Sequence, residues 1–286
     1  ASISTDALQM MLILVSLLVV VPWIILESGP SVVLDGITGV NEVAGLFLPE
    51  GVEVAVTFGI ISALGLLAGP IGDQSFWQRV FSMRKQSVVP AFMLAALFFG
   101  LVPFLMSLLG FLAAGLDFAP DQVGYVNLEI IVSAVPRLGA AILLVVLLSG
   151  LMSTVDSQLV AFGSLMMDWS KPLEWQRFSM VLAGLIGLGI AVIPGITVTA
   201  MFLIYGTLRT SPFLITVLTF LGVTLHPKGA LYGILLGLSL GFPLAIYGNL
   251  FDVAWARLAA VLVALLGSGL FALLFRFIAG RERSKL

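Results

Sequence analysis

The sequence predicts an all-α membrane protein that crosses a bilayer about eight times. Hydrophobic residues make up 60% of the chain and charged residues only 10%, whereas a soluble domain carries roughly a quarter charged residues. Apolar stretches of about 20 residues, the length of helix that crosses a hydrocarbon core, recur along the whole chain. No stretch remains for a sizeable soluble domain, so we expect a single transmembrane helical domain over residues 1–286.

Eight stretches have the length and composition of spanning helices. They are predicted at residues 7–26, 53–84, 88–115, 138–168, 173–194, 197–224, 229–249 and 252–279. A shorter amphipathic piece near residues 127–135 is too short to span. The second stretch contains Pro70 among three glycines, which weaken or remove backbone hydrogen bonds, so a break is expected there. Such a break either lines a cavity that binds a solute or is a simple proline kink.

Positive charges predict the direction of threading, because Lys and Arg concentrate in short cytoplasmic loops. If the eight helices alternate, most basic residues fall on one side, at Arg79, Arg84, Lys85, Lys171, Arg177, Lys228, Arg276, Arg281, Arg283 and Lys285. Most acidic loop residues fall on the other side. Both termini are therefore predicted to be cytoplasmic, in a cytoplasmic or inner membrane.

Composition and motifs argue against several classes of function. The net charge of −2 disfavours nucleic acid, and the absence of cysteine removes disulfides and thiolate metal sites. No HExxH, GxSxG or GxxxxGK[ST] pattern occurs, so hydrolytic and nucleotide-driven activities have no motif to support them. We therefore expect a protein that is not an enzyme.

The densest polar cluster lies within the predicted helix 138–168. Ser149, Ser153, Asp156 and Ser157 are spaced so that they share one face of a helix. A carboxylate with adjacent hydroxyls is a hard oxygen ligand set, which suits Na⁺ or a proton better than a soft transition metal. The alternative is that these small polar residues form hydrogen bonds between helices.

Two further ionisable residues have open interpretations. Asp6 lies at the start of the first predicted helix, where it could cap the helix or bind an ion. Arg209 lies within the predicted helix 197–224, where it could pair with an acid or face a permeation path.

A glycine pattern lies on the predicted helix 229–249. Glycines recur every four residues, at Gly229, Gly233, Gly237 and Gly241. This spacing places them on one face, and the pattern predicts that another helix packs closely against that face.

Three segments together resemble the sodium:solute symporter family. They are TDALQ at residues 5–9, GDQSFWQR at 72–79 and MSTVDSQ at 152–158, and their order and spacing match as well. The resemblance implies the leucine-transporter-type inverted-repeat fold from its fifth core helix onward. The chain would then hold the second half of that fold plus extra C-terminal helices.

The resemblance also implies site residues and a coupling ion, Na⁺. One sodium site would use the carbonyl of Gly150 and the hydroxyls of Ser153 and Thr154. A second cation site, found in some relatives, would use Ser153, Asp156, Ser157 and Asp6. Solute contacts would come from the broken helix, near Leu66, Ala68, Gly69 and Gln74. The aromatic and amide side chains that sugar transporters use there are absent, which disfavours a sugar.

The first four core helices of the family have no counterpart in the chain. They include the broken helix that supplies half of the first sodium site, and an inverted-repeat transporter needs both halves. We therefore expect sodium-coupled transport of a small solute in which a second polypeptide or a missing segment supplies the first repeat. The alternative is a non-transporting structural or sensory membrane subunit that keeps the fold, and a passive channel ranks third.

Overall fold

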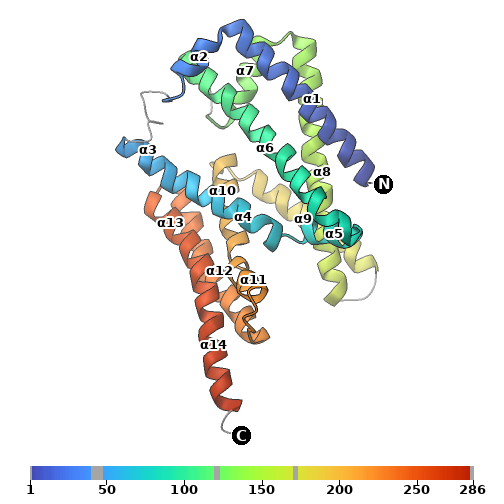
Figure 1. Cartoon of the computed structure of the whole chain (residues 1–286), viewed down its shortest axis with the longest axis vertical. Helices are drawn as coiled ribbons and strands as arrows, with labels where there is room; N and C mark the ends of the chain where they lie inside the picture. Colours follow the sequence, from blue (N-terminus) through green and yellow to red (C-terminus); the bar gives the residue numbers. More distant parts are fainter. Residues whose placement is uncertain (1, 40–47, 119–122, 170–172, 284–286) are drawn as a thin grey trace. The chain divides into compact units, whose positions relative to one another are not determined.

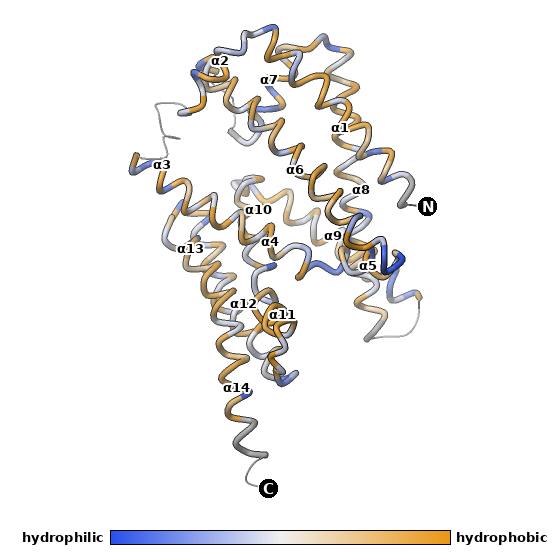
Figure 2. Tube along the Cα trace, in the orientation of Figure 1, coloured by the Kyte–Doolittle hydropathy of each residue, from blue (hydrophilic) through white to orange (hydrophobic). Residues whose placement is uncertain are grey.

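The computed structural model describes the whole chain except residues 1, 40–47, 119–122, 170–172 and 284–286 (Figure 1). Of the described residues, 88% are helical and none forms a strand. Seven described segments are long and apolar enough to cross a membrane, at Thr5–Ser28, Pro49–Gly72, Lys85–Gly115, Arg137–Met167, Val198–Phe220, Pro227–Leu250 and Ala254–Ile278. Hydrophobic residues dominate these segments (Figure 2). The prediction of an all-α, multi-pass membrane protein is confirmed.

The eighth predicted span, residues 173–194, forms the helix α9 (Leu173–Ala191), which is less apolar than these seven segments. Its first two turns carry Glu174, Gln176 and Arg177, which lower the average hydropathy. Its 19 residues give a length of about 28 Å at 1.5 Å per residue, close to the hydrocarbon thickness. The number of crossings therefore depends on α9.

We expect α9 to cross the membrane, because this keeps the basic loops on one side. The chain contains no cysteine, so Glu174→Cys and Thr197→Cys place a single thiol near either end of α9. A membrane-impermeant maleimide should label the two variants from opposite sides of sealed vesicles. Labelling of both from the same side would show that α9 does not cross, and would place the two termini on opposite sides.

The described chain divides into two compact units. The first comprises residues 1–51 and 78–187. Its helices are α1 (Ser2–Ser28), α2 (Pro30–Asp35), α6 (Lys85–Gly115), the 3₁₀ turn η3 (Val123–Tyr125), α7 (Val126–Ala134), α8 (Arg137–Trp169) and most of α9. Buried apolar side chains of α1, α6, α7 and α8 form one core, which includes Leu17, Val21, Ile24, Leu109, Leu112, Ile131 and Leu143. Helix α1 also packs against α8.

The second unit comprises residues 52–77 and 188–286. Its helices are the end of α3 (Pro49–Val54), the π-helical turn η2 (Ala55–Ile60), α4 (Ile61–Gly72), α10 (Val198–Thr210), α11 (Phe213–Phe220), α12 (Pro227–Leu250), α13 (Ala254–Leu262), the π-helical turn η4 (Val263–Gly267) and α14 (Ser268–Arg283). Helix α5 (Gln74–Ser82) begins in this unit and ends in the first. Helix α4 packs against α10, and α12 packs against α13, η4 and α14.

The glycines of α12 face the helices that follow it, as the four-residue spacing predicted. A Cβ at Gly233 would lie 2.4 Å from the carbonyl oxygen of Ser268, and one at Gly241 would lie 2.9 Å from that of Ala260. The backbones therefore approach so closely that a side chain at either glycine would require movement.

Two of the predicted spans are interrupted. Helix α4 continues through Pro70 and ends at Gly72; Asp73 is extended, with φ −107° and ψ 118°, before α5 begins. The break in stretch 53–84 therefore lies at Asp73, later than the glycine run suggested. The predicted helix 197–224 is also divided, by a turn at Ser211 and Pro212 between α10 and α11. Pro212 contributes no backbone N–H to a continuing helix.

Candidate functional site

Helices α1 and α8 bring two of the predicted cation ligands together. The hydroxyl of Ser153 donates a hydrogen bond of 2.5 Å to Oδ1 of Asp6, across 147 residues of sequence. Helix α1 begins at Ser2, so Asp6 lies in its second turn and does not cap it. The helix-cap interpretation of Asp6 is therefore wrong.

Gly150 permits this close approach of the two helices. A Cβ at Gly150 would lie 2.5 Å from Cδ1 of Ile13 on α1. The carbonyl of Gly150 also accepts a hydrogen bond of 3.1 Å from the hydroxyl of Thr154 within α8. The three predicted ligands of the first sodium site thus lie on adjacent turns of α8, and Thr154 is exposed.

The other two predicted cation ligands have different surroundings. Asp156 is exposed. The hydroxyl of Ser157 lies 3.4 Å from Nη2 of Arg79, and a guanidinium at this distance disfavours a second cation beside the hydroxyl. Within the described part of the first unit, Asp6 and Ser153 therefore form the best-defined oxygen cluster.

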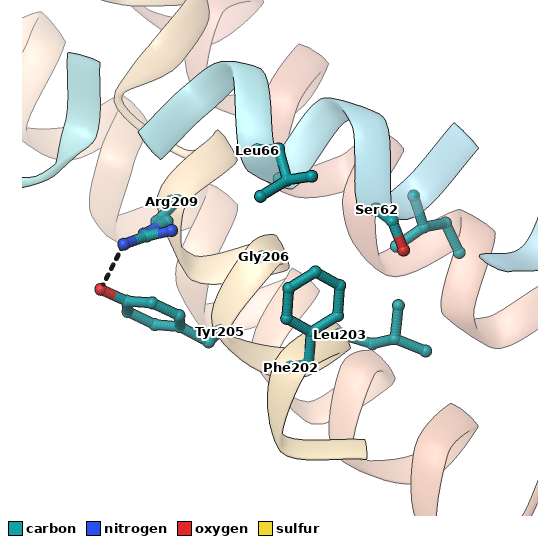
Figure 3. Close-up of a pocket in the computed structure, with 9 residues that line it drawn as sticks. Ser62, Leu66, Phe202, Leu203, Tyr205, Gly206 and Arg209 are labelled. Carbon is teal, nitrogen blue, oxygen red and sulfur yellow. Dashed lines mark hydrogen bonds between the residues drawn. The ribbon is translucent and has the colours of Figure 1, made fainter. Parts of the chain in front are cut away.

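The second unit contains a buried ion pair between the two interrupted helices. Nη2 of Arg209 lies 2.7 Å from Oδ2 of Asp73, and their side chains are 19% and 4% exposed. The hydroxyl of Tyr205 donates to the same carboxylate oxygen at 3.1 Å and accepts from Nη2 of Arg209 at 2.7 Å (Figure 3). Of the two interpretations of Arg209, the structure supports pairing with an acid.

Asp73 also fixes the start of α5. Its second oxygen, Oδ1, accepts hydrogen bonds from the backbone N–H of Ser75 at 3.0 Å and from the Ser75 hydroxyl at 2.8 Å. One buried carboxylate therefore stabilises the beginning of α5 and also binds Arg209 and Tyr205 of α10 at the point where α4 ends.

A small pocket adjoins this ion pair, between α4 and α10 (Figure 3). The cavity volume is about 10 Å³, which is room for about one water molecule. Two polar atoms at the pocket, Oγ of Ser62 and Nε of Arg209, are buried and have no hydrogen-bond partner among the described residues. The remaining lining residues are Ile61, Gly65, Leu66, Phe202, Leu203, Tyr205 and Gly206.

The predicted solute contacts are distributed unevenly around this pocket. Leu66 lines it, whereas Ala68 and Gly69 are buried. A Cβ at Gly69 would lie 3.3 Å from Nη1 of Arg209, so this glycine makes room for the arginine. Gln74 is half-buried at the start of α5.

Neither Ser62 nor the role of Asp73 as partner of Arg209 was predicted from the sequence. The signal for the pair was present, because an acid and a base within or beside apolar stretches each require a partner. A lone serine on an apolar helix carries no comparable signal.

The fold defines the class of protein, a multi-pass α-helical membrane protein. Compared with protein-family models, curated proteins and solved structures, the chain gives no match. The described residues contain no group of three or more His, Cys, Asp or Glu side chains that could hold a metal ion. Any cation site formed by these residues alone would therefore have at most two such side chains, and hydroxyl, amide or carbonyl oxygens would supply the other ligands.

Proposed function

We propose that the chain is part of a sodium-coupled symporter for a small organic solute, with the first-repeat helices supplied from outside this chain. The observation that carries the proposal is the hydrogen bond between Asp6 and Ser153. These residues belong to two of the three segments that resemble the symporter family. Their contact brings a carboxylate oxygen and a hydroxyl oxygen together where α1 meets α8, and both are hard oxygen ligands of the kind that suits Na⁺.

The two predicted cation positions differ in what they need from a partner. The position around Asp6 and Ser153 lies within one unit of this chain. The position around Gly150 and Thr154 would need ligands from a first-repeat helix, so it would form only in the complete assembly. Sodium moving down its gradient through these positions would drive closure around the solute.

We propose that the solute has no net charge and that only one of its polar groups enters the pocket beside Leu66, which has room for about one water molecule. Arg209 is already neutralised by Asp73, so adding a free anion would leave uncompensated charge in a region of low dielectric. Nε of Arg209 and the hydroxyl of Ser62 would instead receive an acceptor oxygen of a neutral or zwitterionic solute.

The proposal predicts that the hydroxyls of α8 are needed for sodium-dependent uptake. In the complete assembly, Ser153→Ala and Thr154→Ala should each raise the Na⁺ concentration for half-maximal uptake at least about tenfold, because each removes an oxygen ligand. The measurement is Na⁺-driven uptake of radiolabelled proline, urea, pantothenate, sialic acid and glucose into vesicles. Ser239→Ala, on an exposed position of α12, serves as the matched control. Unchanged Na⁺ dependence in both α8 variants at equal expression would refute the proposal.

The close packing of α4 on α10 favours a second candidate, a non-transporting structural or sensory subunit. A Cβ at Gly65 would lie 2.7 Å from Cα of Gly206, and the adjoining pocket has room for about one water molecule. This candidate predicts that the chain purifies with a partner polypeptide and that no labelled solute accumulates under a sodium gradient.

The proposed localisation is a cytoplasmic or inner membrane with both termini in the cytoplasm. The proposed partners are the lipid bilayer, the solute and the polypeptide or segment that carries the first repeat; no nucleic acid is proposed.

A further inference from the structure

Gln9 lies on the face of α1 that contacts α8. It follows Asp6 by three residues and precedes Ile13 by four, and both spacings place side chains on one face of a helix. Asp6 contacts Ser153, and Ile13 lies against Gly150. Because both neighbours on its face contact α8, we expect Gln9 to lie level with the turn of α8 that runs from Gly150 to Ser153.

The amide oxygen of Gln9 is buried and unsatisfied. Oε1 has no hydrogen-bond partner among the described residues. An amide oxygen can only accept, so it requires either a donor hydrogen or a cation. A buried acceptor without either is unfavourable, and the Asp6 carboxyl group, another oxygen ligand, lies one turn away on the same face of α1.

We propose that Gln9 is a cation ligand, and that its amide oxygen, the Asp6 carboxylate and the Ser153 hydroxyl together bind one monovalent cation between α1 and α8. The inference rests on the proposed function and adds a ligand to it. The hydroxyl of Ser153 donates its hydrogen bond to Asp6, which leaves the lone pairs of its oxygen available to the ion. The single carboxylate balances one positive charge, whereas Ca²⁺ sites commonly use several carboxylates.

The chain itself can test this site, because all three ligands lie in one unit. The full chain is purified in detergent, and its thermal unfolding is followed by the fluorescence of its five tryptophans. NaCl replaces choline chloride at constant ionic strength. A ligand that binds only the folded state raises the unfolding midpoint with its concentration, which gives an apparent Na⁺ affinity.

Gln9→Leu should weaken the apparent Na⁺ affinity at least about tenfold, a typical loss when one group that supports a metal site is removed. Gln9→Asn, which shortens the side chain by one methylene, should also weaken the apparent Na⁺ affinity. This variant replaces Gln9→Leu in the test if the leucine variant does not fold. Asp6→Asn should abolish the Na⁺ response. Gln86→Leu, at an exposed position near the start of α6, should leave it unchanged.

The outcomes separate this inference from the proposed function. If Asp6→Asn abolishes the response while both Gln9 variants bind Na⁺ as the native chain does, Gln9 is not a ligand and the sodium site stands without it. If the native chain shows no stabilisation by Na⁺ over choline, the sodium site itself is refuted, and the assignment of Gln9 is refuted with it.

Discussion

An Arg209→Met variant is expected to lose about 3–5 kcal/mol of unfolding free energy, because it leaves a buried carboxylate without its cationic partner. The Asp73 side chain is only 4% exposed, and Arg209 lies 2.7 Å from it. Methionine keeps much of the length and apolar contact of the arginine stem. The lower free energy of unfolding would therefore come more from the missing positive charge than from a loss of side-chain volume.

The loss should be largely reversed when the carboxylate is neutralised as well. In Asp73→Asn/Arg209→Met, the asparagine oxygen can still accept from Ser75, but no buried charge remains. The free energies of unfolding of the native chain, both single variants and the double variant form a double-mutant cycle, measured by denaturant titration in detergent. A double variant as unstable as the sum of the two single changes would contradict a coupled pair.

A second ion pair supplies the control for this experiment. Arg257 pairs with Asp252, whose side chain is 88% exposed. Exposed pairs contribute about 0–1 kcal/mol, so Asp252→Asn should change the unfolding free energy by no more than that. Asparagine also tolerates the positive φ of 54° at this position.

The ion pair also limits what the neighbouring pocket can bind. Asp73 uses both oxygens, one toward Ser75 and one toward Arg209 and Tyr205. Neither oxygen is therefore left to attract a cation into the pocket, and the polar atoms there without a hydrogen-bond partner among the described residues are Nε of Arg209 and Oγ of Ser62. This arrangement supports the division of roles in the proposed function, with the cation bound by the first unit and the solute bound by the second.

Long apolar stretches could be predicted closely from the sequence. The stretches predicted at 88–115 and 138–168 correspond to α6 (Lys85–Gly115) and α8 (Arg137–Trp169). Each is bounded by charged residues or prolines, so composition alone marks where the helix ends. The glycine face of α12 could also be predicted, because glycines four residues apart form a continuous strip along one side of a helix, where a second backbone can approach.

Breaks within helices were harder to predict. Pro70 and three glycines suggested an interruption in the middle of the stretch 53–84, yet α4 continues through them to Gly72. The interruption at Ser211 and Pro212 was not predicted. Whether a helix is interrupted depends on the partners that tertiary packing offers to backbone groups at the turn, and here the hydroxyl of Ser268 donates to the carbonyl of Ser211 at 2.6 Å. That contact joins residues 57 apart, which no local pattern reveals.

At the candidate site, too, contacts between residues far apart in the sequence could not be predicted from local patterns. The residues of the Asp6–Ser153 contact were predicted from the family resemblance, but their direct hydrogen bond depends on how α1 and α8 pack. Ser157 shares the predicted helix face, yet it lies beside Arg79, and helical periodicity on α8 cannot predict a side chain that arrives from α5. The pairing of Asp73 with Arg209 spans 136 residues and likewise follows from tertiary packing.

The second large effect is expected at the helix contact of α12. Gly233→Ala should lower the unfolding free energy by about 1–3 kcal/mol, the usual cost of adding atoms to a close-packed contact. The new Cβ would lie 2.4 Å from the carbonyl oxygen of Ser268 and 3.4 Å from the amide nitrogen of Ala272. Both atoms belong to the backbone of α14, so no flexible side chain can move aside, and the two helices must separate.

Gly189→Ala tests whether the lower unfolding free energy of Gly233→Ala comes from the contact between α12 and α14 or from the replacement of a glycine as such. Gly189 lies within α9, and a Cβ there would meet no atom within 4 Å. Alanine is favoured over glycine within a helix by about 1 kcal/mol, so this variant should be neutral or more stable. Denaturant titration of both variants in the same detergent should therefore give changes of opposite sign or clearly unequal size. Equal losses would mean that the close approach of α12 and α14 does not limit stability, and that the backbone contact with Ser268 is not the reason for glycine at position 233.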